Sequence, residues 1–385
     1  MKILLLTDGI TPFVLGGMQK HSANLAKYLT LAGVEVTLVH CVALGDDVPS
    51  DKRVNETLFS DGKKLSKIIG LKFPAMGNIP GHYLKESYRY SEIVYDKVKA
   101  DLDNYDFIYA KGFSAWKLLH KRSKGIKMPP IGLKFHGYEM FQKPPSFRAR
   151  IERLFLRKPV KWNTLSADYV FSYGAKITDL IKKIGVTEDK IIEIPSGIDN
   201  AWIRESIIEV SSPVKFVFLG RYERRKGIEE LNDVLNDIIE NNDFEFHFIG
   251  PIPMDKQVKN DKIVYHGVVQ DKTKLTGLLD AGDVLVCPSH SEGMPNVILE
   301  GMARGMALIA TDVGAVRLLV SEKVGVLLKE IDKEELKQAI LTLSKLEPPK
   351  LLEMKINSLE LVSNEFQWER IVEKVIEKVK EVING

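Results

Sequence analysis

Two glutamates separated by seven residues are the part of this sequence best suited to chemistry. Residues 291–303 read SEGMPNVILEGMA, with acids at Glu292 and Glu300. The glycine and proline after Glu292 indicate a loop, and the apolar run that follows indicates a helix starting near Pro295. A helix start presents backbone amides, and a carboxylate on the helix accepts hydroxyl hydrogen bonds. The segment therefore predicts a site for a polar, hydroxyl-rich ligand. The amides would come from Met294, Asn296 and Val297.

A basic loop supplies a second candidate. The apolar run 214–219 is followed by GRYERRKG at 220–227, which contains Arg221 and Lys226. Ligands of open α/β sheets bind at the carboxyl ends of strands. Arginine offers a fork of donors and lysine a point charge, so the two together suit a diphosphate. The alternative to diphosphate binding is that the basic side chains of this loop contact only solvent. This interpretation applies best to Arg224 and Arg225.

Two weaker candidates precede them in the chain. Gly16 and Gly17 stand before a predicted helix, where glycine allows close backbone approach to a phosphate. Many glycines at such places only form a turn, so a simple turn remains the alternative to a phosphate-binding loop. His136 follows the apolar run 131–135 and ends a predicted strand. A lone histidine at such a place is more often structural than functional.

The elements around these residues form a repeating strand–helix order. Continuous apolar runs alternate with helical patterns, which predicts α/β architecture with doubly wound parallel sheets, Rossmann-like in each half. The pattern restarts after Ser211-Ser212-Pro213, which indicates a domain boundary near 205–213. Strands are predicted at 2–7, 34–39, 107–110, 131–135, 169–172, 214–219, 245–249, 262–266, 283–287, 307–310 and 324–328.

The last helix carries its own signal. From Trp368 the apolar residues recur with a 3.6-residue period to Ile383. Such a stripe needs a surface to cover. It packs either on its own domain or across on the first domain, and the period does not separate the two.

Length and composition narrow the class of protein. The chain has 385 residues, 44% hydrophobic and 28% charged, which suits two globular domains and excludes general disorder. Cys41 and Cys287 are the only cysteines, so a disulfide framework and a cysteine zinc cluster are excluded. The start of the chain lacks a signal-peptide pattern, and no apolar run is long enough to span a membrane. We expect a cytoplasmic protein.

Together these residues resemble glycosyltransferase family 4, the retaining enzymes of GT-B fold. The Glu292-to-Glu300 spacing is the most specific match, followed by Arg221 and Lys226, the glycine loop and Phe135-His136-Gly137. Pro195–Asp199 and Phe366–Glu369 match further segments of the family. The resemblance implies an N-terminal acceptor-side domain at 1–208, a donor domain at 209–364, and a helix at about 365–385 crossing back to the first domain, the two domains facing across a cleft.

The resemblance also implies a reaction. It predicts transfer of a sugar, of hexose type, from a nucleotide-diphosphate sugar to a glycan or lipid-linked acceptor, with retention of configuration, in cell-surface polysaccharide or glycolipid synthesis. Arg221 and Lys226 would hold the diphosphate and Glu300 the ribose. Glu292 and residues 294–297 (Met294, Pro295, Asn296, Val297) would contact the donor sugar, with Gly16 and Gly17 in the donor site. His136 would approach the sugar from the first domain. With two cations in that role no cofactor or metal is expected, and Asp101 with Asp103 is interpreted as part of a charged helix.

One segment departs from the family pattern. Residues 311–318 read TDVGAVRL, where the family usually has a second glycine, then proline and glutamate. The corresponding positions here are Ala315, Arg317 and Leu318. Because this segment lies near the donor pocket in the family, the preference for donor sugar or base is open. The nucleoside, sugar, acceptor, linkage and oligomeric state are not specified by the sequence.

A basic block suggests a further partner. Residues 111–161 hold 14 Lys and Arg against two acids, and 147–158 follow helical spacing with apolar and basic residues interleaved. The pattern is typical either of an interfacial helix on an anionic membrane or of an ordinary helix with its apolar side in the core. We favour an anionic surface, with peripheral binding at the inner face of the cytoplasmic membrane. Alternatives are other GT-B chemistry, such as a nucleotide-sugar epimerase, a sugar-binding relative without activity, or a nucleic-acid-binding protein. The patch lacks an aromatic series for base stacking, so no nucleic acid is expected.

Overall fold

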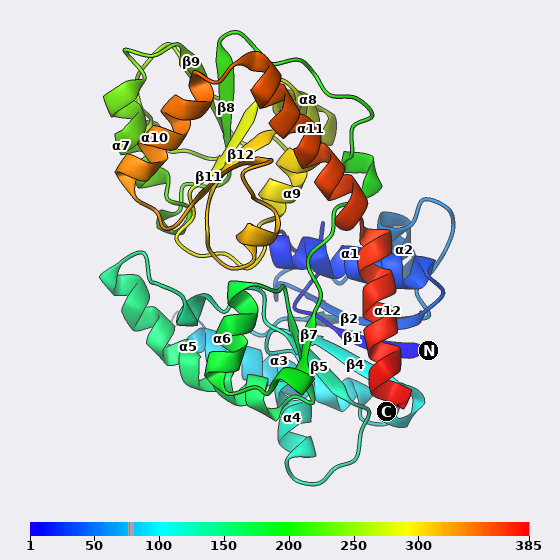
Figure 1. Ribbon diagram of the computed structural model, residues 1–385. Coiled ribbons are helices and arrows are strands. Elements are labelled where there is room, and N and C mark those ends of the chain that lie inside the picture. The colour runs from blue at the N-terminus through cyan, green and yellow to red at the C-terminus, as the bar shows by residue number, and fades with distance from the viewer. Residues whose placement is uncertain (76, 78–80, 385) are drawn as a thin grey trace. The chain divides into compact units, whose positions relative to one another are not determined.

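A parallel sheet forms the centre of each half of the chain (Figure 1). The computed structural model describes residues 1–75, 77 and 81–384. These residues form two compact units, which are described separately. The first unit comprises Met1–Phe141, Ile151–Ser196 and the chain from Trp368 onward, and the second comprises Gln142–Arg150 and Gly197–Gln367.

The first sheet has the strand order β3-β2-β1-β4-β5-β6-β7, with parallel pairing throughout. Its strands are β1 (Lys2–Leu6), β2 (Glu35–Val42), β3 (Lys67–Lys72), β4 (Phe107–Lys111), β5 (Ile131–Lys134), β6 (Tyr169–Ser172) and β7 (Ile191–Glu193). The helices are α1 (Gly17–Leu31), α2 (Asp51–Leu58), α3 (His82–Val98), α4 (Trp116–Arg122), α5 (Phe147–Ser166), α6 (Lys176–Ile184) and α12 (Trp368–Asn384). The first four residues of α5, 147–150, belong to the second unit.

The second sheet has the order β10-β9-β8-β11-β12-β13 and is also parallel. Its strands are β8 (Val214–Leu219), β9 (Phe244–Ile249), β10 (Ile263–Tyr265), β11 (Val284–Cys287), β12 (Ala307–Thr311) and β13 (Gly325–Leu328). The helices are α7 (Ile228–Ile238), α8 (Lys272–Asp280), α9 (Asn296–Ala303), α10 (Lys333–Ser344) and α11 (Pro348–Glu365). The predicted α/β fold of two Rossmann-like parallel-sheet domains is confirmed.

The burial of the strands explains why continuous apolar runs in the sequence predicted them. In β1, the four residues Ile3 to Leu6 are fully buried, because helices cover both faces of a doubly wound sheet. In the second sheet, β11 and β12 are buried along their whole length. A strand buried on both faces has no polar side, so it appears in the sequence as a continuous apolar run.

Two strands of the first sheet were not predicted from the sequence. β3 (Lys67–Lys72) is only partly buried at the sheet edge, and a glycine interrupts its apolar residues. β7 (Ile191–Glu193) occupies the other edge and has three residues. A half-covered strand such as β3 and a very short one such as β7 both leave a weak hydrophobic pattern in the sequence.

The last helix packs in the first unit, as predicted for a crossover helix. α12 lies against α1, and Ile371, Val372, Val375 and Val379 are buried in the core of the first unit. Trp368, 1% exposed, meets the ring of His21 edge to face at 5.0 Å. The predicted range of about 365–385 is split in the structure: α11 ends at Glu365, α12 begins at Trp368, and Gly385 lies outside the described residues.

Candidate active site

The second sheet opens at its carboxyl edge between β8 and β11. β8 pairs with β9 on one side and with β11 on the other, so the chain order reverses there. Loops leaving two such strands run in opposite directions and leave a crevice where ligands of this fold class bind. Arg221 and Lys226 follow β8, and Ser289 to Glu292 follow β11. The sheet order thus brings together the two strongest candidates of the sequence.

Glu292 is the centre of this cluster. Its Oε1 lies 2.6 Å from Lys226 Nζ and accepts a 2.9 Å hydrogen bond from Ser289 Oγ, and its Oε2 lies 3.2 Å from Arg225 Nη1. The residue is 6% exposed. Burial by itself raises the pKa of Glu292, but the charges of Lys226 and Arg225 and the hydrogen bonds outweigh it, so the pKa lies below its ordinary value. The carboxylate is therefore ionised and holds two cations in place.

The two predicted diphosphate ligands differ in how they are held. Lys226 is 18% exposed and bound to Glu292, whereas Arg221 is 72% exposed and pairs with Glu223 at 3.0 Å. Arg225, for which a solvated position was the favoured prediction, contacts Glu292 and Glu223 and is 29% exposed. Nothing in the spacing of the basic loop distinguishes Arg225 from its neighbours, since the distinction depends on where the loop after β11 lies.

Arg224 belongs to a second, adjacent network. Its guanidinium donates to Glu230 at 2.6 Å, and His290 Nε2 lies 3.0 Å from the other Glu230 oxygen. Burial by itself raises the pKa of Glu230, but hydrogen bonds with His290 and Arg224 outweigh it and lower the pKa to about 2. The backbone amide of His290 also donates to the Arg225 carbonyl at 2.8 Å. These bonds join the loop after β8 to the loop after β11.

Two glycines make this approach of loops feasible. Gly227 has φ +69°, and a Cβ there would lie 1.8 Å from the Pro288 carbonyl oxygen. Gly314, in the loop after β12, has φ +56°, and a Cβ would lie 2.3 Å from the carbonyl oxygens of Glu292 and Gly293. Both positions require left-handed backbone and closely approaching main chain, so only glycine fits.

The segment that departs from the family pattern lies against the Glu292 loop. The Ala315 amide donates to the Gly293 carbonyl at 2.8 Å, and Ala315 is fully buried. Arg317 donates from Nε to Asp312 Oδ1 at 3.1 Å. Leu318 is 42% exposed. The bond to Gly293 comes from the main chain and does not depend on the alanine side chain, whereas Arg317 holds Asp312 within its own segment.

Helix α9 begins as the sequence predicts. Pro295 is its N-cap residue, and Asn296 is the first helical residue. Met294 is fully buried, Asn296 and Val297 are half-buried, and Glu300 is 7% exposed. The partial positive charge of a helix N-terminus lies at this end of α9. Glu300 follows one turn later, so the helix places its carboxylate near that charge.

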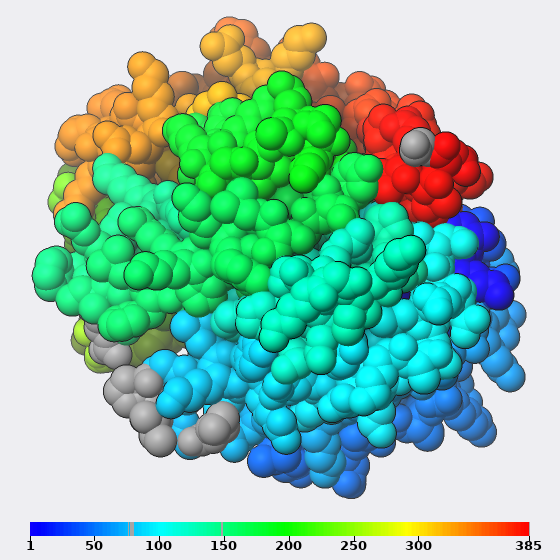
Figure 2. All heavy atoms as spheres, turned by 90° about the horizontal axis from the view of Figure 1, so that it is seen from below, coloured from blue at the N-terminus to red at the C-terminus, as the bar shows by residue number. Residues whose placement is uncertain are grey.

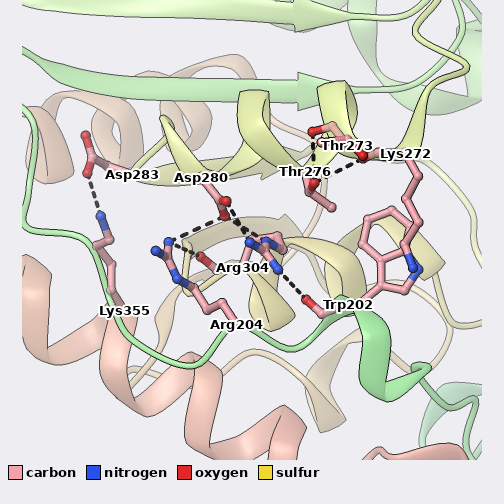
Figure 3. A network of polar contacts seen from close by, with 9 residues as sticks. All are labelled: Trp202, Arg204, Lys272, Thr273, Thr276, Asp280, Asp283, Arg304 and Lys355. Atoms are coloured by element: carbon pink, nitrogen blue, oxygen red, sulfur yellow. Dashed lines mark hydrogen bonds and ion pairs between the residues drawn. The ribbon is translucent and has the colours of Figure 1, made fainter.

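The other end of α9 is anchored by ion pairs (Figure 3). Asp280, at the end of α8, accepts bonds from Arg304 Nε at 2.7 Å and Arg304 Nη2 at 2.6 Å. Arg204 lies 3.5 Å from the same carboxylate and donates to the Arg304 carbonyl at 3.2 Å. The segment after Gly197 is thereby tied to the helix that carries Glu300.

The remaining predicted site residues lie in the first unit. Gly16 is the N-cap of α1, and Gly17 begins that helix. Lys111, at the end of β4, reaches the first two turns of α1, where its Nζ donates to Met18 O at 2.9 Å and Ser22 Oγ at 2.8 Å. Burial lowers the pKa of Lys111 to about 7, although the charge of Asp8 opposes the shift. A buried lysine therefore holds the start of the helix that follows Gly16.

His136 follows β5 and is held by Tyr173 from the end of β6. Tyr173 Oη and His136 Nδ1 are 2.9 Å apart, and the rings meet edge to face. Burial raises the pKa of Tyr173 well above its ordinary value, so its hydroxyl stays protonated. When that hydroxyl donates to Nδ1, the neutral imidazole carries its proton on Nε2. Lys134 Nζ lies 3.8 Å from the centre of the Tyr173 ring and packs on its face.

The acidic residues do not gather as a metal site in the part of the chain that the structure describes. Asp101 pairs with Lys67 at 2.7 Å, and Asp103 is exposed on a short 3₁₀ turn. The helices of that part of the chain are likewise all too short or too polar to cross a bilayer.

Comparisons with known proteins show similarity to glycosyltransferases. Residues 15–202 match the family model described as Glycosyltransferase Family 4, and residues 213–345 match the model described as Glycosyl transferases group 1. The chain is 33% identical over 185 residues to TuaC of Bacillus subtilis, a protein assigned by name to teichuronic acid biosynthesis as a glycosyltransferase, and that match spans 46% of each chain. It is 24% identical over 347 residues to the uncharacterized glycosyltransferase MJ1607 of Methanocaldococcus jannaschii, covering 84% of each.

Solved structures share the fold over the whole chain. Sucrose-phosphate synthase from Thermosynechococcus elongatus superimposes with a TM-score of 0.77 at 19% identity, covering 100% of this chain and 99% of that one. The Anabaena protein HepE, solved in complex with UDP and glucose, superimposes with a TM-score of 0.68 at 18% identity, covering 99% and 100%. At these identities the likeness concerns the fold.

Proposed function

The chain belongs to glycosyltransferase family 4, and from this we propose that it moves a sugar from a nucleotide-diphosphate sugar to a glycan or lipid-linked acceptor. By their names, its relatives and structural neighbours include proteins of teichuronic acid and lipopolysaccharide synthesis. The observation that carries the proposal is the contact of Lys226 with Glu292 at the β8–β11 crevice. A hexose donor and a role in making cell-surface polysaccharide or glycolipid are parts of the same proposal.

The charges of the cluster suit the leaving group. When the bond from the anomeric carbon to the diphosphate breaks, negative charge grows on the phosphate oxygens. Lys226 and Arg225 are already fixed by Glu292, and the start of α9 adds its amides, so little rearrangement is needed as that charge develops. Arg221, more exposed, can turn onto the diphosphate. Because these cations supply the compensating charge, we propose that the reaction needs no metal or other cofactor.

The stereochemical course is proposed from the family resemblance. In a retaining, same-face transfer the acceptor oxygen bonds to the anomeric carbon as the bond to the diphosphate breaks. The acceptor hydroxyl proton passes to the leaving phosphate oxygen, so no separate base is required. Within this scheme Glu300 binds the ribose hydroxyls and His136 contacts the sugar through the proton on Nε2.

Nucleotide binding tests the proposal. We would titrate UDP, GDP and ADP by calorimetry in the presence of a chelator, into wild type, Lys226→Ala and Glu300→Ala. We expect one nucleotide to bind, and its affinity to fall about tenfold or more in each variant, since charge-assisted hydrogen bonds are lost. Lys378→Ala is the matched control, because this exposed lysine pairs with its near neighbour Glu381 in the first unit. Binding that needs added divalent metal, or that is unchanged by Lys226→Ala, would contradict the site.

Helix α5 supports an additional proposal on location. Its apolar residues Phe147, Ile151, Leu154 and Phe155 are 76%, 45%, 50% and 69% exposed. The interpretation of this stripe as a core-facing side is therefore wrong. Among the arginines between these apolar residues, Arg153 is buried, and Arg157 donates to the Met140 carbonyl at 2.8 Å. The side chain of Arg148 is not among those that the structure describes. Residues coloured teal to green, the range that contains α5, form part of the outer surface in Figure 2.

We propose that α5 docks a cytoplasmic enzyme on an anionic membrane. Exposed apolar residues beside exposed basic ones, here Arg150 and Lys158, are typical of an interfacial helix. A nucleic-acid-binding surface needs the charge but not the apolar stripe. Flotation with vesicles of neutral lipid, and of neutral lipid with anionic lipid, tests it. We expect binding only to the anionic vesicles, reduced by high salt and by Phe155→Ser. Equal binding of Phe155→Ser and wild type would contradict the role of α5.

A further inference from the structure

The first unit contains a pocket of about 440 Å³ at the carboxyl edge of its sheet. It lies beside the reversal of strand order between β1 and β4. Its walls come from the residues after β1, β2, β3 and β4 and from the first turns of α3. The lining residues that characterise it chemically are the two acids Asp8 and Asp46 and five aromatic residues, among them Phe73, Tyr83, Tyr90 and Phe113.

Aromatic rings build much of this pocket and hold one another in place. Phe113 stacks on Trp116 with ring centres 5.0 Å apart, and Tyr83 meets the edge of Phe113. Phe73 packs on Tyr90, whose hydroxyl donates to the Thr7 carbonyl at 2.6 Å. Rings fixed in this way offer preformed flat surfaces to a ligand.

The pocket has a marked charge preference. Asp8 and Asp46 both line it, and none of the described lining residues is Lys, Arg or His. Asp8 Oδ1 is shielded from solvent and has no hydrogen-bond partner among the described residues. Burial raises the pKa of Asp8, although the charge of Lys111 opposes the shift. A carboxylate in the pocket wall accepts but does not donate hydrogen bonds, so it favours a ligand that brings a hydroxyl donor. Two acids disfavour an anionic ligand.

The mouth of the pocket is apolar as well. Leu15 is 83% exposed and Tyr83 is 47% exposed, and both line the pocket. A sugar ring combines the required features, because its C–H faces pack on aromatic rings while its hydroxyls reach a carboxylate. A phosphate or a carboxylate on that ring would enter a site with acids and without a cation.

We propose that this pocket binds an uncharged saccharide ring of the acceptor, with Asp8 accepting a hydrogen bond from one of its hydroxyls and the aromatic rings covering its faces. The inference rests on the proposed function, since it names the chemical class of the acceptor. It separates this chain from transferases whose acceptor sugar is phosphorylated or is a uronic acid.

Saturation-transfer NMR with soluble glycosides tests the charge preference. The probes are p-nitrophenyl glucoside and galactoside, the matched p-nitrophenyl glucuronide and glucose 6-phosphate. We expect saturation transfer from the protein to a neutral glycoside, and no saturation transfer to either of the two anionic probes. Asp8→Asn keeps the size of the side chain, and we expect it to weaken neutral-glycoside binding about tenfold while reducing the discrimination against the glucuronide. Tyr83→Ala, at the exposed mouth, is expected to weaken binding without unfolding the protein.

The controls distinguish this inference from its alternatives. Asp103→Asn removes an exposed acid of the same unit outside the pocket and is expected to change nothing. The inference is overturned if the anionic probes bind as well as the neutral ones, if no glycoside binds, or if Asp8→Asn has no effect. Displacement of the glycoside by a short isoprenol would instead assign the pocket to an apolar chain. Nucleotide binding to the second unit is measured in the same samples, and its absence from wild type would count against the proposed function rather than the pocket.

Discussion

Lys226 and Glu292 meet at 2.6 Å although they stand on different loops, one after β8 and one after β11. The contact lies at the point where the strand order of the second sheet reverses. Glu292 is nearly buried, and Arg225 and Ser289 also bond to its carboxylate. In the proposed reaction its function is thus to fix the cations that receive the diphosphate, in addition to any contact with the sugar.

Replacing this carboxylate should therefore affect catalysis more than binding. Glu292→Gln leaves Lys226 and Arg225 without their common anion, so we expect turnover to fall on the order of a hundredfold, as for loss of a preorganised electrostatic group. Nucleotide affinity should change less, because the positive charges remain. Steady-state kinetics with the donor identified by calorimetry measures both. Glu322→Gln, an exposed acid of the same unit, is the control, and equal turnover of Glu292→Gln and wild type would contradict this role.

Glu230 should make the second unit sensitive to acid. Its pKa is about 2 in the folded protein against an ordinary 4.5, so its stabilising effect is complete above pH 4.5 and is lost as pH falls from there to about 2. We expect Glu230→Gln to lower the free energy of unfolding by about 2 kcal/mol at neutral pH. The difference from wild type should shrink below pH 4.5. Urea unfolding across that range measures it.

Glu229→Gln is the matched control for this experiment. Glu229 also pairs with Arg224, at 3.1 Å, but it is 48% exposed. An exposed pair contributes little, so its loss should change stability by less than about 1 kcal/mol. A pH-independent difference between Glu230→Gln and wild type would show that the carboxylate is not ionised as inferred.

A buried ion pair distant from the crevice should be the most costly one to break. Lys355 and Asp283 meet at 2.7 Å with side chains 2% and 1% exposed (Figure 3). Asp283 also accepts the backbone amide of Lys215 at 3.0 Å. Lys355→Met leaves a buried anion, and we expect it to lower the free energy of unfolding by about 3 to 5 kcal/mol. The double variant Asp283→Asn/Lys355→Met should recover much of that loss in urea unfolding, and additive effects would argue against the pair.

Two glycines offer a matched test of the loop that supports Glu292. Gly314 and Gly267 both have positive φ, at +56° and +64°, but only Gly314 faces main chain within reach of a Cβ. Gly267→Ala should cost only the left-handed strain, about 1 kcal/mol. Gly314→Ala should cost more and reduce nucleotide binding, because the Glu292 loop must shift. Thermal unfolding and calorimetry compare the two, and equal effects would remove the steric argument.

Local patterns along the chain were enough to predict the fold class and most of the elements. The fully buried strand β11 and the buried part of β1, Ile3 to Leu6, are apolar along their length. The apolar stripe of α12 recurs every turn. Each of these patterns reflects the side-chain environment of a single element. The glutamate spacing around α9 is likewise local, since a loop and a helix start are specified within a few residues. Among the described strands, the sequence analysis missed two edge strands: β3, which is only partly buried, and β7, which has three residues.

Which side chains meet depends instead on the packing of the sheets. Arg225 rather than Arg221 joins Lys226 on Glu292 because the order of β8 and β11 brings two loops together, and no spacing along the chain carries that order. The exposure of Phe155 on α5 depends on which face of the helix the first unit covers. The aromatic pocket around Asp8 draws on four strand ends and a helix. Hydrophobic periodicity along the chain indicates which residues are buried. Contacts between side chains far apart in the sequence depend on how the strands of the sheet and their loops pack.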